Sequence, residues 1–123
     1  MVNALLKKMS LKISHIEHKN CTELILGGKG LSEDHFLPLI ELTSQQLNKH
    51  SNNIILNLEN LELINSLGLN SFIKIFTKSR NLGGDLYIVN ISDKINQVLL
   101  LTKLNSVLNI ATSLKEAKEI FNT

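Results

Sequence analysis

Ser66 is the residue of this 123-residue chain whose type and position give the clearest reason to expect chemistry. It stands between an apolar run that ends near Ile64 and a segment with helical apolar spacing from Leu69, so a strand is expected to pass into a helix there. The first turn of a helix presents unpaired N–H groups and the positive end of the helix dipole. A hydroxyl there can carry a phosphate, or it can simply cap the helix. Local physics alone favours the plain cap, formed by Ser66 or Asn65 and worth about 1 kcal/mol.

The four histidines are candidate metal ligands by residue type. They are His15, His18, His35 and His50. His15 and His18 are expected on a strand and in the turn after it, where they should point to different faces. No cluster of cysteines or carboxylates completes a ligand set, so the histidines are interpreted as surface residues and no metal is predicted.

Three further patterns also have structural interpretations. The stretch Gly27-Gly28-Lys29-Gly30 lacks the spacing of a phosphate-binding loop and is interpreted as a turn. Cys21 has no paired histidine in the local sequence and is expected to be a partly buried thiol. Glu59 and Glu62 are interpreted as solvated loop residues. The sequence therefore predicts no catalytic residues, no cofactor and no enzymatic activity.

Apolar spacing elsewhere predicts strands and helices in alternation. Strands are expected at residues 11–15, 22–26, 54–58, 86–91 and 107–111, and helices at 32–50, 69–81, 93–102 and 114–121. The first two strands, joined by a short polar turn, predict a hairpin, and the later alternation predicts a parallel sheet. We therefore expect a single α/β domain over residues 10–123, with a mostly parallel central sheet of four to five strands, an N-terminal hairpin and about four helices.

Helix boundaries are predicted from capping and breaking residues. Pro38 would cost about 3 kcal/mol inside a helix, so the regular helix is expected to begin only near Leu37, with 32–36 as an irregular approach to it. The other expected signals are Ser32 or Asp34 as a cap of that helix, the pair Gly83-Gly84 as a stop, Ser92 or Asp93 as a cap, and the capping box from Ser113 to Glu116.

Composition limits the classes of protein that the chain can belong to. Apolar residues make up 43% and charged residues 20%, which suits one packed core and argues against disorder. A net charge of +2 and the absence of tryptophan give no basis for a nucleic-acid or membrane partner. One cysteine suits a reducing cytoplasm. Residues 1–9 have neither the order nor the length of a signal peptide and are expected to be a leader.

The stretch from Asn53 to Phe121 resembles the STAS domain, and within it the bacterial anti-sigma factor antagonists. The residues that carry the resemblance are Ile54-Ile55-Leu56-Asn57-Leu58, Asn65-Ser66-Leu67-Gly68-Leu69, Gly83-Gly84, Leu86-Tyr87-Ile88-Val89-Asn90, Val98-Leu99, Leu104 and Glu116-Ala117. They match in order the family's apolar strand, its Asp-Ser-Ser/Thr-Gly-Leu motif, its Gly-Gly stop, the next strand and the C-terminal helices. Gly28 matches the family's glycine after the second strand.

The resemblance implies a function for Ser66. In the family, the serine directly after the aspartate is phosphorylated by a kinase that is also the anti-sigma factor, and Ser66 matches that serine. The resemblance thus implies a regulatory module that binds an anti-sigma factor serine kinase and is restored by a serine phosphatase, with a homodimer left open. The residues expected to bind the partner are Asn65, Ser66, Leu67, Gly68, Asn70 and Ser71.

Three departures from the family motif keep other functions open. Asn65 replaces the usual aspartate, Leu67 replaces a second hydroxyl residue, and Leu31 stands near the place of an acidic residue. These differences favour an alternative in which the same fold is a non-phosphorylated scaffold subunit, for example on the ATPase of a lipid-transport ABC complex. A small-ligand or nucleotide module is the third interpretation, although the sequence offers no dedicated pocket residues for it.

Overall fold

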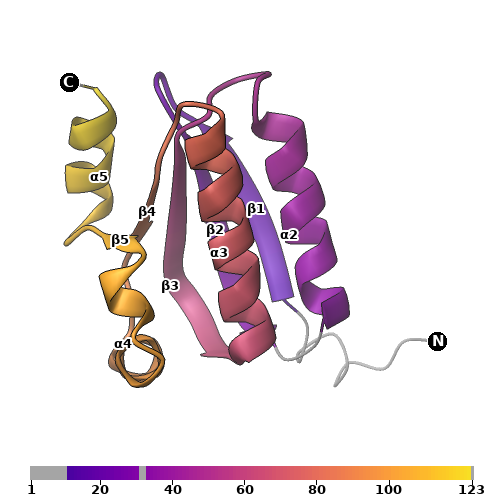
Figure 1. Ribbon diagram of the computed structural model, residues 1–123, viewed down its shortest axis with the longest axis vertical. Helices are drawn as coiled ribbons and strands as arrows, with labels where there is room; N and C mark the ends of the chain where they lie inside the picture. The colour runs from indigo at the N-terminus through magenta and orange to yellow at the C-terminus, as the bar shows by residue number, and fades with distance from the viewer. Residues whose placement is uncertain (1–10, 31–32, 123) are drawn as a thin grey trace.

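The computed structural model describes residues 11–30 and 33–122, which form a five-stranded sheet with helices packed on it (Figure 1). The elements are β1 (Leu11–Glu17), β2 (Thr22–Gly30), α2 (Glu33–Gln46), β3 (Ile54–Ile64), α3 (Ser66–Asn81), β4 (Leu86–Val89), α4 (Asp93–Leu101), a 3₁₀ turn (Leu104–Ser106), β5 (Asn109–Ile110) and α5 (Leu114–Phe121). The expected leader at 1–9, the residues Leu31 and Ser32, and the side chain of Asp34 lie outside the described part.

The strand order β1-β2-β3-β4-β5 confirms the expected α/β fold. β1 pairs with β2 as an antiparallel hairpin, and the other neighbours are parallel. The connections from β2 to β3, from β3 to β4 and from β4 to β5 each lead to the adjacent parallel strand, always toward the same edge of the sheet. Since such crossovers share one hand, their helices α2, α3 and α4 lie on one face of the sheet. The last helix, α5, follows the last strand and packs on the opposite face.

The larger apolar core lies between the sheet and the helices α2, α3 and α4. Its buried residues come from alternate positions of the strands and from the inner faces of the helices, including Leu24, Leu56, Phe36, Phe72 and Leu99. Phe72 and Leu56 have no exposed surface. Each such side chain stabilises the fold by about 1.5–3 kcal/mol relative to its exposed state.

A smaller core lies under α5. The Ser113 side chain caps this helix by accepting a hydrogen bond from the Glu116 amide at 3.1 Å, as the sequence predicts. Ala117 is fully buried, and Phe121 meets the Tyr87 ring edge to face, with 5.5 Å between the ring centroids. None of the described helices is long and apolar enough to cross a membrane.

Two of the predicted loop regions are strand. β2 continues to Gly30 and β3 to Ile64, so the turn expected at Gly27–Gly30 and the loop expected around Glu59 and Glu62 were wrong. The pairing of β2 with β3 is irregular at two places, and Gly28 has a φ of 85°. Glycine takes this conformation without strain, so the strand bends there and continues where the sequence indicates a turn. Glu59 and Glu62 are nonetheless exposed, on the strand.

The bounds of α2 also differ from the prediction. The helix begins at Glu33 and includes Pro38, rather than starting near Leu37. Phe36 and Leu39, on either side of the proline, are buried in the larger core, and their burial offsets the missing backbone hydrogen bond. The helix ends at Gln46 and not at His50, because the chain reverses through Asn48, whose φ is 68°. Smaller differences are that β1 runs to Glu17, β4 ends at Val89, and β5 has two residues.

Candidate functional site

The start of α3 is fixed by the side chain of Asn65. Its Oδ1 atom accepts hydrogen bonds from the amides of Leu67 at 3.1 Å and Gly68 at 3.3 Å. The Asn65 amide in turn donates to the carbonyl of Gly30, at the end of the neighbouring strand, at 3.3 Å. The plain cap expected at this position is therefore Asn65, and Ser66 is left out of the capping interaction as the first residue of the helix.

Ser66 is exposed at the end of α3 where the helix dipole is positive. The first turn of α3 contains no acidic residue, and the cap is a neutral amide rather than the family's carboxylate. A negative group on the Ser66 oxygen would therefore meet a favourable helix end and no like charge from this turn. This position allows both modification and contact with another protein.

The predicted contact residues divide into exposed and buried ones. Ser66, Leu67 and Asn70 are exposed and point outwards from the start of α3, whereas Gly68 and Ser71 are buried. A Cβ atom on Gly68 would lie 2.4 Å from side-chain atoms of both Ile64 and Phe36, so this glycine allows α3 to pack closely. The Ser71 hydroxyl donates to the Leu67 carbonyl at 3.1 Å. Gly68 and Ser71 therefore position the exposed residues and offer little contact surface themselves.

An apolar surface beside Ser66 includes residues of α2 that the sequence did not point to. Leu67 is 42% exposed and Leu37 is 48% exposed. Both line a cavity of about 320 Å³ between the first turns of α2 and α3, together with Ile40 and Ile73. The buried face of α2 is predictable from its apolar spacing, but the packing that brings Leu37 next to Leu67 is tertiary. Leu67, the residue directly after Ser66, thus lines a mostly apolar hollow.

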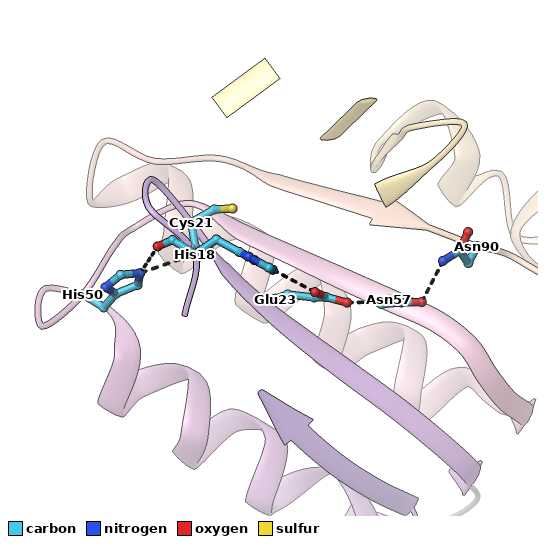
Figure 2. Close-up of polar contacts among 6 residues, drawn as sticks. All are labelled: His18, Cys21, Glu23, His50, Asn57 and Asn90. Atoms are coloured by element: carbon cyan, nitrogen blue, oxygen red, sulfur yellow. Dashed lines mark hydrogen bonds and ion pairs between the residues drawn. The ribbon is translucent and has the colours of Figure 1, made fainter. Parts of the chain in front are cut away.

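A row of hydrogen-bonded polar side chains, with Glu23 and Asn57 buried at its centre, crosses the opposite face of the sheet (Figure 2). His18 Nε2 lies 2.8 Å from Glu23 Oε1, and the side-chain Nδ2 of Asn57 donates to Glu23 Oε2 at 2.9 Å. Asn90 then donates to Asn57 Oδ1 at 3.1 Å. Glu23 and Asn57 are in register with Ile55 and Val89 of the smaller core, which places the row beside α5. The sequence prediction missed this row, although Asn57, the polar residue in an apolar strand, was a signal for it.

Two of the histidines, His18 and His50, and the buried Cys21 lie at the β1–β2 turn. His50 Nε2 lies within hydrogen-bond distance of the carbonyls of His18 and Cys21. Cys21 is buried more completely than expected, and burial raises the pKa of its thiol; the Lys118 cation opposes this effect to a smaller extent, and the Glu23 carboxylate adds to it. Among residues 11–30 and 33–122, no three histidine, cysteine, aspartate or glutamate side chains are placed to hold a metal ion.

Comparisons with known proteins identify the family of the chain. The STAS domain model matches residues 15–117. A Thermotoga maritima protein named as a candidate anti-sigma factor antagonist is 34% identical over 73 residues, which cover 59% of this chain and 65% of that relative's length. The matched part is therefore less than two thirds of the relative.

Solved structures support the fold. The crystal structure of a candidate anti-sigma factor antagonist from Thermotoga maritima has a TM-score of 0.80 at 24% identity, covering 90% of this chain and 95% of that one. The Bacillus cell fate determinant SpoIIAA in its phosphorylated form has a TM-score of 0.66 at 16% identity, covering 90% of this chain and 99% of that one. Both identities are low, so these structures show the fold alone. Because the STAS domain model matches residues 15–117 of this 123-residue chain, the chain belongs to the STAS domain family.

Proposed function

We propose that the chain is an anti-sigma factor antagonist that binds a kinase-type anti-sigma factor in the cytoplasm and is switched by phosphorylation of Ser66. The observation that carries this proposal is the exposure of Ser66 at the first residue of α3, directly before the exposed Leu67, which shares a hollow with Leu37. The relative from Thermotoga maritima, named as a candidate anti-sigma factor antagonist, supports the same class of function.

Phosphorylation would weaken the complex through a local change of charge. The unmodified hydroxyl and its apolar neighbours can be desolvated against a partner at small cost. A phosphate carries about −1.5 to −2 charges, and burying it without a paired cation is expensive. The net charge of the chain would fall only from +2 to about zero. The loss of binding would therefore come from the local charge at Ser66 and not from repulsion over the whole surface. A serine phosphatase would restore the binding form.

The test is incubation of the domain with an anti-sigma factor serine kinase and ATP, followed by mass spectrometry and a binding assay. We expect one added phosphate, located on Ser66, and none on Ser66→Ala. We also expect Ser66→Asp to bind the kinase at least tenfold more weakly than the unmodified chain. If the chain gains no phosphate and Ser66→Asp binds the kinase unchanged, the switch is rejected. Asn96→Ser, an exposed change on α4 away from the expected contact residues, is the matched control for surface alteration.

A second function follows from the residues that differ from the family motif. The Asn65 side chain is engaged with two helix amides and provides no carboxylate beside Ser66. Leu67 replaces a hydroxyl residue with an exposed apolar one, which suits a constitutive contact. A non-phosphorylated scaffold on an ABC ATPase is favoured by these two observations. Co-purification with such an ATPase, unchanged by Ser66→Asp, would support the scaffold over the switch.

A further inference from the structure

A continuous crease runs between α2 and α3 from the Ser66 end to the opposite end of both helices. It consists of three hollows of about 320, 320 and 260 Å³. The first two share Ile40, Ile73 and Lys74, and the second and third share Lys78. We call this feature the α2/α3 crease. Figure 1 shows the two helices side by side on the front of the sheet.

The floor of the α2/α3 crease is apolar along most of its length. Ile40 and Ile73 are half-buried in its middle. Leu67 stands at one end, and Leu82, which is 41% exposed, stands at the other. From Leu67 to Leu82 the helix rises by about 22 Å. This is the length of a helix of about 15 residues, so the crease is long enough to hold four turns of a partner helix.

The rim of the crease that α3 provides is positively charged. Lys74 and Lys78 are exposed and lie one turn apart, and α3 contains no acidic residue. The ion pairs found among the described residues both involve histidines, so neither lysine has a carboxylate partner there. Lys78 donates only to the neutral Ser44 hydroxyl, at 3.0 Å. The rim therefore offers two cations to a ligand that brings negative charge.

We propose that the α2/α3 crease binds an amphipathic helix of the partner, with an apolar ridge against Ile40 and Ile73 and carboxylates against Lys74 and Lys78. This deepens the proposed function and rests on it for the identity of the partner. The charge complementarity also argues against the chain's own leader as the occupant. Residues 1–9 carry Lys7 and Lys8 and no carboxylate, so two like charges would face the lysines of the rim.

The probes are two synthetic 16-residue peptides with the same leucine stripe at helical spacing, one with glutamates and one with lysines at the flanking positions. Binding is followed by amide chemical shifts of the isotope-labelled domain. We expect the acidic peptide to shift amides of α2 and α3 and to bind at least about fivefold more tightly than the basic peptide. The double variant Lys74→Glu/Lys78→Glu should reverse that preference.

A control variant and the choice of probe separate this test from that of the switch. Lys94→Glu removes an exposed lysine on α4 and should leave the peptide preference unchanged. The peptide assay contains neither kinase nor ATP, so a failed phosphorylation test and a failed crease test give different results. The proposal is overturned if neither peptide binds, if both bind equally, or if the shifts lie on the α5 face. It is also overturned if the crease amides shift with protein concentration alone, which would mean that a second copy covers them.

Discussion

His18 Nε2 lies 2.8 Å from a carboxylate oxygen of Glu23, a residue that is only 2% exposed. The second oxygen of the same carboxylate accepts a hydrogen bond from Asn57. A buried carboxylate is tolerated only when its oxygens have partners, so the turn that carries His18 and the middle of β3 are joined through Glu23. The arrangement makes the β1–β2 turn part of the core of the domain rather than a free loop.

Replacing Glu23 should therefore destabilise the domain strongly. Glu23→Ala leaves the donors of His18 and Asn57 without their acceptor and should lower the free energy of unfolding by about 3–5 kcal/mol. Glu23→Gln keeps one acceptor and should cost less, about 1–2 kcal/mol. Urea denaturation measures both. Glu59→Gln, which changes an exposed carboxylate on the neighbouring strand, is the control and should change stability by less than about 0.5 kcal/mol.

Cys21 should make stability depend on pH in the alkaline range. Burial raises the pKa of this thiol above its ordinary value of 9.0 in the folded chain. Well below pH 9 the thiol is protonated in both states and the pH has no effect through this group. As the pH rises above 9, the unfolded chain loses the proton first, so the free energy of unfolding falls. Cys21→Ala should lack this part of the alkaline decrease.

Denaturant midpoints of the wild type and Cys21→Ala between pH 8 and pH 10.5 would measure this effect. Alkylation at pH 8 gives a second reading, because a buried, protonated thiol should react much more slowly in the folded chain than in urea. Equal reaction rates in the two conditions would show that Cys21 is accessible.

The adjacent glycines Gly83 and Gly84 should respond very differently to alanine. A Cβ atom on Gly84 would lie 1.8 Å from the backbone oxygen of Asn52, and no side-chain rotation can relieve this clash. Gly84→Ala should therefore cost at least about 3 kcal/mol. Gly83 has a φ of 89° but open space around it, so Gly83→Ala should cost about 1–2 kcal/mol from backbone strain alone. Thermal unfolding of the two variants compares them, and the reverse order would contradict this packing.

Asn65 should be replaceable by the aspartate of the family motif but not by alanine. Asn65→Ala removes the acceptor of two helix amides and should cost about 1 kcal/mol. Asn65→Asp keeps that acceptor and places a negative charge at the positive end of the helix, which should be neutral or stabilising by about 0.3–1 kcal/mol at low salt. Denaturation in low and high salt tests this, since only the gain from Asp should decline as salt is added.

The sequence predicted the elements more reliably than their ends. The order of strands and helices, the caps at Ser92 and Ser113 and the stop at Gly83 are all found, because each depends on local spacing or on a local hydrogen bond. The extension of β2 through Gly28 was missed because the left-handed conformation of a glycine serves a bent strand as well as a turn. The inclusion of Pro38 in α2 depends on the burial of its neighbours, which local propensity does not contain.

For the candidate site, the sequence located Ser66 but not its surroundings. Its place at the start of a helix is a matter of local pattern. The exposure of Leu37 beside Leu67 and the joining of His18 to Asn57 through Glu23 depend on which strands and helices become neighbours. Leu37 and Leu67 are 30 positions apart, and Glu23 and Asn57 are 34 positions apart, so no spacing rule within one segment can predict these contacts.

The placement of α5 has a consequence for how this domain tolerates shortening. In the described part of the chain, α5 is the helix that shields the smaller core, whose sheet residues include Ile55, Val89 and Tyr87. A polypeptide that stopped before Ser113 would leave those side chains facing water on a flat sheet surface and would be prone to aggregate. The eight residues of α5, although they lie on the other face of the sheet from α3, are thus needed for the domain to remain monodisperse in solution.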